Sequence, residues 1–257
     1  MPLRPHHCGA LPPPDDRPRG QTRPGTAQLC VVFDGDDTLW STELLYDEAR
    51  AEARQIVKAS GLDGARWEAL ERQIDVENVA VFGHSAERFP QSCRQAYDAL
   101  RVALGMDLDE ATANTIEQAA RKVFDRPAQL TPGASDTLRT LKEHGARLGL
   151  LTKGDPVVQR KRISDSTLAP YFDAISIVPT KSPDSVLEII KRLGACDRST
   201  WVVGNSMRSD IVPALAAGAN AVWIDAHVWE YERHEGTLDD HVIRAERLTD
   251  VLRIVGL

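Results

Sequence analysis

The residues in this sequence that are best suited to chemistry are three aspartates, Asp34, Asp36 and Asp37, which directly follow an apolar run at 29–33. A run this short, rich in valine and apolar on both faces, predicts a buried strand of a parallel sheet. The carboxylates are then expected at the carboxyl end of that strand, where open α/β sheets bind their ligands. Because clustered carboxylates repel one another and oxygen ligands suit a hard ion, they predict a site for Mg²⁺.

Two simpler explanations of the acidic cluster fit less well. A solvated acidic turn does not need the large apolar residues Phe33, Leu39 and Trp40 on either side. A calcium loop of the EF-hand type requires a glutamate at its twelfth position, and counting from Asp34 that position is Leu45. A functional site at the end of a buried strand is the better interpretation.

The composition argues against several other classes of protein. The chain has 257 residues, 42% hydrophobic and 27% charged, which is enough for one large domain or two smaller ones. A net charge of −7 without a basic cluster argues against nucleic-acid binding, and the lack of an apolar run of about 18 residues argues against a membrane span. The four cysteines show no Cys-x-x-Cys spacing, so we expect a reducing, cytoplasmic protein without a zinc or redox motif.

Residues 1–27 differ in composition from the rest of the chain. This segment contains seven prolines, several arginines and almost no large apolar side chains. It cannot bury enough surface to order itself, and it lacks the continuous apolar stretch of a secretory signal. We therefore expect a disordered tail that is rich in proline and arginine.

Two hydrophobic patterns divide the remainder of the chain. Between 41 and 129 apolar residues recur at helical spacing, and no segment there has the pattern of a strand. The predicted helices are 43–60, 66–76, 86–104 and 108–124. Further on, strands predicted at 146–151, 174–178, 200–203 and 219–224 alternate with helices predicted at 135–144, 157–164, 184–193 and 211–217. This alternation predicts an α/β fold with a Rossmann-like parallel sheet, formed by 28–40 and 130–257, and a helical insert at 41–129.

Polar residues also follow the other predicted strands. They are Thr152, Lys153 and Gly154 after the strand at 146–151, Lys181 after the strand at 174–178, and Gly204, Asn205 and Asp210 after the strand at 200–203. Because the carboxyl ends of parallel strands meet at one edge of the sheet, we expect these residues to lie close to the aspartates.

Taken in order, these short motifs resemble those of the haloacid dehalogenase (HAD) superfamily. The segment 34–38 is similar to its first motif, Asp-x-Asp-x-Thr, and 150–152 to its second, a hydrophobic strand that ends in threonine. Lys181 is similar to the third motif, and Gly204-Asn205 with Asp210 to the fourth. The resemblance covers residues 29 to about 225 and implies the HAD fold, with the helical insert at 41–129 in the position of a C1 cap.

The resemblance also implies roles in phosphoryl transfer. Asp34 attacks phosphorus and forms an aspartyl-phosphate, and Asp36 protonates the leaving oxygen and later deprotonates a water molecule. The Thr152 hydroxyl and nearby main-chain N–H groups hold the phosphoryl oxygens. Lys181 offsets the charge of the nucleophile and the phosphate.

The metal ligands implied by the resemblance are the Asp34 carboxylate, the main-chain carbonyl of Asp36 and the Asp210 carboxylate, which hold Mg²⁺. Many family members have Gly-Asp at the fourth motif, where this chain has Gly204-Asn205. Asn205 keeps an oxygen ligand, or a hydrogen bond to a metal-bound water, but loses a charge. Weaker metal affinity is therefore expected.

The second aspartate of the first motif, Asp36, indicates phosphoryl chemistry, since haloacid dehalogenases lack it and need no metal. The resemblance thus implies a phosphatase that acts on a small phosphorylated metabolite. A phosphomutase of the same superfamily keeps the same residues and stays an alternative. A regulatory or scaffold protein that retains the fold is a third possibility, because of Asn205. The oligomeric state is not visible in the sequence.

Substrate specificity is expected to reside in the helical insert. Its segment 82–89 places glycine, histidine and arginine between two predicted helices, and His84 and Arg88 are the candidates for substrate contact. Arg88 can pair with a second anionic group on the substrate, or it can be a surface arginine in an ordinary loop. On the core side, Lys153 and Gly154 are candidates for substrate binding, and the alternative for Lys153 is a solvated loop lysine.

Two further side chains, His227 and Trp229, follow the last predicted strand. They can border the entrance to the site or, as is more common for such residues, pack the C-terminal segment. The sequence leaves both interpretations open.

Overall fold

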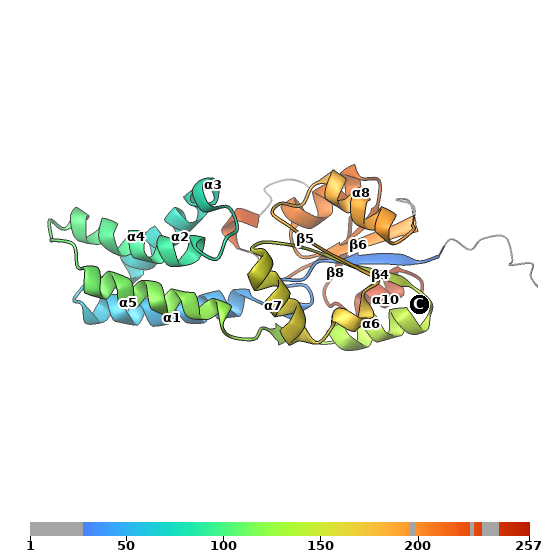
Figure 1. Cartoon of the computed structure of the whole chain (residues 1–257), viewed down its shortest axis with the longest axis horizontal. Helices are drawn as coiled ribbons and strands as arrows, with labels where there is room; N and C mark the ends of the chain where they lie inside the picture. The colour runs from blue at the N-terminus through green and yellow to red at the C-terminus, as the bar shows by residue number, and fades with distance from the viewer. Residues whose placement is uncertain (1–27, 196–198, 227–228, 233–241) are drawn as a thin grey trace, which may run out of the picture.

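The computed structural model of the protein describes residues 28–195, 199–226, 229–232 and 242–257. The expected disordered tail at 1–27 and the expectation for His227 lie outside these ranges. Within them the chain forms an α/β lobe and a helical lobe, which lie next to each other along the long axis of the molecule (Figure 1).

A six-stranded parallel sheet forms the centre of the α/β lobe. Strand β1 (Cys30–Phe33) pairs with β4 (Arg147–Lys153) on one side and with β6 (Thr200–Gly204) on the other. The strands beyond these pairs are β5 (Ala174–Val178) next to β4, and β7 (Asn220–Ile224) followed by β8 (Val242–Ala245) next to β6. The predicted α/β class is confirmed, and the carboxyl ends of all strands meet at one edge of the sheet.

Helices cover both faces of the sheet, as expected when the central strand is apolar on both sides. Along β1 alternate residues enter different clusters, Val31 and Phe33 on one face and Val32 on the other. The first face is covered by α6 (Ala134–Glu143), α7 (Pro156–Ser166) and α10 (Asp250–Ile254), and the second by α8 (Pro183–Arg192) and α9 (Val212–Ala216) (Figure 1). This packing fixes the strand ends from which the polar residues project.

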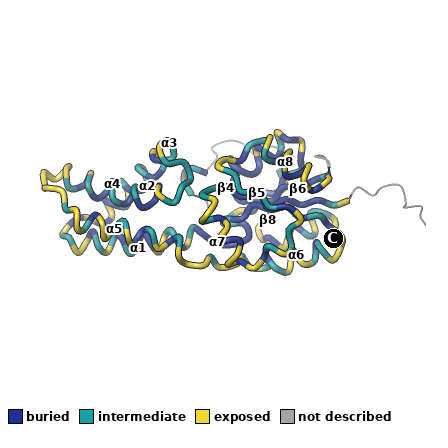
Figure 2. The backbone as a smooth tube through the Cα atoms, viewed as in Figure 1, coloured by how far each residue is buried: buried dark blue, intermediate teal, exposed yellow. Residues whose placement is uncertain are grey.

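The helical lobe, residues 43–124, is inserted in the chain between β1 and β4 and has an apolar core of its own. It consists of α1 (Glu43–Ala59), α2 (Gly64–Glu77), α3 (Val79–Phe82), α4 (Arg88–Ala103), α5 (Glu110–Arg121) and the 3₁₀ turn η1 (Lys122–Phe124). The fully buried Trp67, Tyr97 and Leu100 belong to this core. Figure 2 shows buried segments in both lobes. None of the described helices is long and apolar enough to cross a membrane.

Several short elements differ from the sequence-based expectation. The prediction that no strand lies between 41 and 129 is wrong at both ends, because β2 (Trp40–Ser41) pairs antiparallel with β3 (Gln129–Leu130). The chain passes between the lobes at this point, and strands of two residues are too short to show a periodicity. The elements α3, β8 and α10 are also missed, as are the turns η2 (Ala169–Tyr171), η4 (Met207–Ile211) and η5 (Glu230–Glu232).

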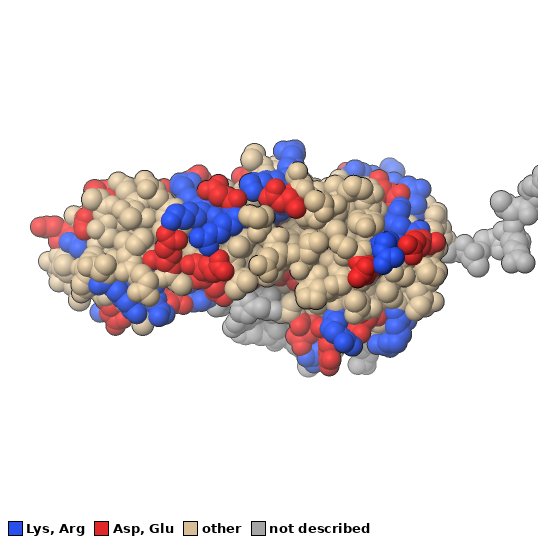
Figure 3. Space-filling view, turned by 90° about the horizontal axis from the view of Figure 1, so that it is seen from below, with Lys and Arg blue, Asp and Glu red and all other residues tan. Residues whose placement is uncertain are grey.

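Charged side chains on the helical lobe form pairs of opposite sign. Arg126 Nη1 lies 2.8 Å from Glu48 Oε2, and Arg54 Nη1 lies 3.0 Å from Glu68 Oε2. Figure 3 shows basic and acidic side chains next to each other over this lobe. Exposed ion pairs stabilise a fold by only about 0–1 kcal/mol each, so the stability of the lobe depends mainly on its apolar core.

The core of the helical lobe can be tested by replacing Leu100, which is fully buried, with alanine. We expect Leu100→Ala to lower the free energy of unfolding by about 3 kcal/mol, because it removes buried methyl groups and leaves a cavity. The matched control, Leu108→Ala, removes the same atoms from a residue that is 54% exposed and is expected to cost less than about 0.5 kcal/mol. Urea unfolding followed by tryptophan fluorescence measures both, and equal losses would contradict the assigned packing.

Candidate active site

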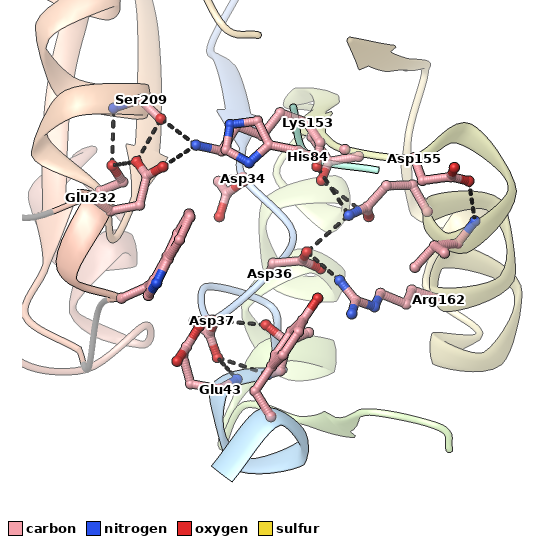
Figure 4. A pocket seen from close by; sticks show the side chains of 18 of the residues that line it. Asp34, Asp36, Asp37, Glu43, His84, Lys153, Asp155, Arg162, Ser209 and Glu232 are labelled. Atoms are coloured by element: carbon pink, nitrogen blue, oxygen red, sulfur yellow. Dashed lines mark hydrogen bonds and ion pairs between the residues drawn. The ribbon is translucent and has the colours of Figure 1, made fainter. Parts of the chain in front are cut away.

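A cavity opens where the carboxyl edge of the sheet faces the helical lobe. Its volume is about 960 Å³, including the part that is open to solvent. Every site residue proposed from the sequence lines it: Asp34, Asp36, His84, Arg88, Thr152, Lys153, Gly154, Lys181, Asn205 and Asp210. Residues far apart in the sequence therefore meet in one place, as the strand-end argument predicts, and Figure 4 shows Asp34 in the middle of them.

A buried ion triplet lies at the base of this cavity. The ammonium nitrogen of Lys181 is 2.5 Å from Asp34 Oδ1 and 2.6 Å from Asp210 Oδ1. Lys181 is placed between β5 and α8, whose first turn is fixed by a capping box of Ser182 and Ser185. All three charged side chains are buried, which makes the ammonium group essential to the pair of carboxylates.

The charge balance of the triplet alters proton affinities. Burial and the charge of Asp210 raise the pKa of Asp34 to about 7, although Lys181 acts in the opposite direction. Burial alone would lower the pKa of Lys181, but the carboxylates of Asp210 and Asp34 raise it, so the ammonium stays protonated. Two carboxylates that share a single ammonium leave an excess of negative charge. A further cation at this place is electrostatically favourable.

The loop that carries Asp210 is shaped by a close approach of the main chain. Asp210 lies in the π-helical turn η4, which is capped by Ser206, and its Oδ2 accepts a hydrogen bond from the Ser206 N–H at 2.9 Å. A Cβ atom added to Gly204 would come within 2.3 Å of Asp210 Cγ. Only glycine therefore fits at this position while Asp210 keeps its place.

The second aspartate of the first motif points toward a different element. Asp36 Oδ1 accepts a hydrogen bond from Trp40 Nε1 at 2.7 Å, and Asp36 Oδ2 accepts from Gln159 Nε2 at 2.8 Å and Arg162 Nη1 at 2.5 Å. Gln159 and Arg162 belong to α7 and lie three residues apart, hence on the same face of that helix. Figure 4 shows the Asp36 carboxylate next to the Arg162 side chain. Neither of these α7 residues is predicted from the sequence.

The third aspartate, Asp37, is not among the metal ligands implied by the family resemblance, and it has a structural role. The Asp37 carboxylate accepts hydrogen bonds from the Thr42 N–H at 2.7 Å, the Thr42 hydroxyl at 2.6 Å and the Glu43 N–H at 3.0 Å. These bonds satisfy main-chain donors at the start of α1. Asp37 has φ 60, a conformation that aspartate tolerates better than most residues.

The oxygen donors expected from the family resemblance suit a hard divalent cation. They are the Asp34 and Asp210 carboxylates, the main-chain carbonyl of Asp36 and the amide oxygen of Asn205, and all four residues line the cavity. Among the described residues no three His, Cys, Asp or Glu side chains are grouped as metal ligands. A set with two carboxylates and neutral carbonyl oxygens is nevertheless one that Mg²⁺ accepts, since it needs few protein charges and keeps several waters. The residues present fit the ion.

Thr152 lines the cavity, and another residue caps the helix that follows it. Asp155 accepts hydrogen bonds from the Val157 and Val158 N–H groups at the start of α7. The buried Thr152 hydroxyl donates to Gln159 Oε1 at 3.2 Å. The N–H group of Gly154 donates to the Val178 carbonyl at 3.0 Å.

Lys153 takes part in a polar cluster that the sequence analysis misses. Its ammonium group contacts Glu232, and its Nζ lies 2.7 Å from the Ser209 hydroxyl. The hydroxyls of Ser206 and Ser209 donate to Glu232 Oε2 at 2.5 and 2.6 Å (Figure 4). The alternative of a solvated loop lysine is wrong, because the Lys153 side chain is only 17% exposed. Glu232 comes from the C-terminal part of the chain, and no local pattern connects it to Lys153.

The helical lobe contributes Arg88 and His84 to the cavity wall. Arg88 begins α4, is buried and forms an ion pair with Asp75, so the alternative of a surface arginine in a loop is wrong. Its guanidinium carbon lies 4.2 Å from the ring centroid of Trp229, and the His84 ring lies edge-on to Trp229 at 6.2 Å. Burial and the charge of Lys153 lower the pKa of His84 to about 4, which leaves the imidazole neutral at pH 7. Trp229 both lines the cavity and packs against the lobe.

Comparison with known proteins assigns the family. A model of the haloacid dehalogenase-like hydrolases matches residues 29–218, and the chain belongs to this family of hydrolases. It is 27% identical over 219 residues to a glyceraldehyde 3-phosphate phosphatase from Methanothermobacter thermautotrophicus, covering 82% of this chain and 89% of the relative. It is also 27% identical over 221 residues to a phosphoserine phosphatase from Thermus thermophilus, covering 76% and 88% respectively.

A solved structure supports the same fold. A haloacid dehalogenase-like family hydrolase from Xanthomonas campestris has a TM-score of 0.72 and 23% sequence identity, and the match covers 90% of this chain and 97% of that one. The match to the family model confirms the family assignment predicted from the motifs, and the similarity to this solved structure confirms the fold.

Replacing Glu232 with glutamine tests the cluster around Lys153. Burial would raise the pKa of Glu232, but Lys153 and the two serine hydroxyls lower it to about 2 from an ordinary value of 4.5. A depressed pKa means that the ionised carboxylate stabilises the fold above pH 4.5 and that this contribution is lost as the pH falls toward 2. We expect Glu232→Gln to unfold at lower urea at pH 7, with a loss on the order of 2 kcal/mol.

This difference is expected to shrink below about pH 4.5, where Glu232 of the unfolded wild type takes up its proton. Urea unfolding from pH 8 to pH 3 measures it, with Glu188→Gln, at an exposed position in α8, as the matched control. A difference between wild type and Glu232→Gln that does not change with pH would contradict the proposed ion pair.

Proposed function

We propose that the protein is a Mg²⁺-dependent phosphatase that hydrolyses a small phosphorylated metabolite through an aspartyl-phosphate on Asp34. The observation that carries this proposal is the buried triplet in which Lys181 lies between Asp34 and Asp210, with Asp36 two residues after Asp34 and held separately. The phosphatase names of the curated relatives support it. The four cysteines show no Cys-x-x-Cys spacing, which is compatible with the cytoplasmic setting that we propose.

The reaction follows from the positions of the two aspartates. Asp34 attacks phosphorus, an Asp34–phosphorus bond forms and the bond to the ester oxygen breaks, while Asp36 gives its proton to the leaving alcohol. Asp36 then takes a proton from a water molecule whose oxygen attacks phosphorus. Inorganic phosphate leaves, and the Asp34 carboxylate is restored. Asp34 is the nucleophile and Asp36 is the acid–base group in both steps. No third side chain has to form a covalent bond or transfer a proton.

The other site residues manage charge and position. Lys181 neutralises the negative charge that accumulates between the Asp34 carboxylate and the phosphoryl group, and the Thr152 hydroxyl donates to a phosphoryl oxygen. Asp34, the Asp36 carbonyl, Asp210 and Asn205 would hold Mg²⁺, which would supply additional positive charge to the phosphoryl oxygens. The helical lobe covers this centre and limits the access of water.

Release of inorganic phosphate tests the proposed function. We expect hydrolysis of p-nitrophenyl phosphate and of some sugar, nucleotide or amino-acid phosphates, dependent on Mg²⁺ and lost on chelation. Asp34→Asn is expected to lower kcat by about 10³-fold or more, because the amide is not a competent nucleophile. No release by the wild type from any ester would contradict the proposal and favour a scaffold protein, whereas phosphoryl return to the substrate would identify a mutase.

The asparagine at the fourth motif gives a second test. We expect Asn205→Asp to lower the Mg²⁺ concentration for half-maximal activity by about tenfold, because a charged oxygen replaces a neutral one beside the ion. The matched control is Asn114→Asp, the same change at an exposed position of α5 in the helical lobe. A Mg²⁺ titration of activity measures both variants, and an unchanged half-maximal concentration in Asn205→Asp would place this side chain outside the metal site.

A further inference from the structure

The cationic side chains that line the cavity are all engaged by carboxylates of the protein itself. In the described ranges Lys181 contacts Asp34 and Asp210, and the four others form the ion pairs Arg50–Glu71, Arg88–Asp75, Lys153–Glu232 and Arg162–Asp36. Asp34 and its partners belong to the phosphoryl site. The four remaining pairs surround the space where the rest of the substrate has to lie.

These pairs are built into the protein interior. Arg88 and Arg162 are each only 7% exposed, and Asp75 is 2% exposed. Drawing an arginine away from its carboxylate toward a ligand would leave a buried, unpaired negative charge, which is strongly unfavourable. The arginines therefore fix the shape of the wall and do not offer a free positive charge to a second anionic group. The expectation that Arg88 pairs with such a group does not agree with this arrangement.

Three polar atoms of these ion pairs are buried without a hydrogen-bond partner within the described part of the chain. They are Arg88 Nε, Asp75 Oδ1 and Arg162 Nη2. All three residues line the cavity, but these atoms have almost no exposed surface, so a ligand in the cavity does not reach them. They therefore offer no partner to a carboxylate of the substrate, which the charge of Asp75 repels.

Aromatic side chains supply the rest of this surface. Tyr46, Phe124 and Trp229 line the cavity, together with His84, which is neutral at pH 7. Aromatic faces pack against the C–H surfaces of an uncharged carbon skeleton and give a charged group no partner.

We propose that the cavity selects phosphate esters of uncharged alcohols and discriminates against esters that carry a carboxylate in addition to the phosphate. The proposal deepens the proposed phosphatase function and rests on it. The proposal distinguishes between the substrates named for the relatives, since phosphoserine carries a carboxylate and glyceraldehyde 3-phosphate does not. In this proposal the four ion pairs determine specificity, because their positive charges are already paired with carboxylates of the protein and are not available to a carboxylate of the substrate.

Matched pairs of esters test this selection. Glycerol 3-phosphate and 3-phosphoglycerate differ by a hydroxymethyl group in place of a carboxylate, and glucose 6-phosphate and 6-phosphogluconate form a second, larger pair. We expect kcat/KM to favour the uncharged member of at least one pair by about tenfold or more, and neither pair to favour the carboxylate. Equal values within both pairs, or a preference for the carboxylated ester, would overturn the proposal.

A charge variant shows whether the ion pairs cause the preference. Asp75→Asn removes the carboxylate from Arg88, which keeps its bond to the Asp75 carbonyl. We expect the ratio of kcat/KM between the two members of a pair to shift toward the carboxylated ester by about fivefold or more. Glu232→Gln likewise removes the carboxylate that is paired with Lys153. It serves as the second variant if Asp75→Asn does not fold, as judged by circular dichroism. An unchanged ratio in a folded variant would contradict the role given to the pairs.

Binding measurements separate failure of this inference from failure of the phosphatase proposal. Calorimetry with Mg²⁺ and Asp34→Asn protein, which is expected to bind esters without turning them over, compares the dissociation constants within each pair. Tighter binding of the uncharged ester by about tenfold supports the selection even if no hydrolysis is found with the wild type. Equal or tighter binding of both carboxylated esters overturns it whether or not the protein is a phosphatase.

Discussion

The site depends on one electrostatic constraint, which is that the buried carboxylates of Asp34 and Asp210 can lie side by side only because the Lys181 ammonium group lies between them. The rest of the α/β lobe places these three groups. β1, β5 and β6 end at the same edge of the sheet, the capping box of α8 fixes the main chain at Lys181, and Gly204 leaves room for Asp210. The remaining negative charge favours a metal ion, and the positive charge of that ion would in turn offset the charge of an anionic substrate in the same cavity.

Three aspartates within four residues have different surroundings and therefore different roles. Asp34 faces Lys181, Asp36 is held by Trp40 and by α7, and Asp37 turns back to bond the start of α1. In the proposed mechanism, this separation lets Asp34 act as the nucleophile and Asp36 as the acid–base group, while Asp37 bonds the start of α1. It also links the lobes, because the Asp37 cap fixes the point at which the chain enters the helical lobe.

Much of this arrangement is predictable from sequence, for identifiable reasons. The strand at 29–33 follows from local periodicity, and the gathering of Thr152, Lys181 and Asp210 follows from the rule that parallel strands end at one edge. Other contacts join residues that are distant in the chain, and neither spacing nor composition predicts such contacts. They are the pairing of β2 with β3, the contact of Lys153 with Glu232 and the ion pair of Arg162 with Asp36.

The central claim is that Asp34, and neither of its two neighbours, forms a bond to phosphorus. The most direct test mixes the protein with Mg²⁺ and an excess of a phosphate ester that the protein hydrolyses, and quenches the reaction in acid within the first turnover. Peptide mass spectrometry then locates the phosphoryl adduct. The adduct is predicted on Asp34, absent without Mg²⁺ and absent in Asp34→Asn. An adduct on Asp36 or Asp37, or rapid phosphate release with no adduct at any time, would contradict the assignment.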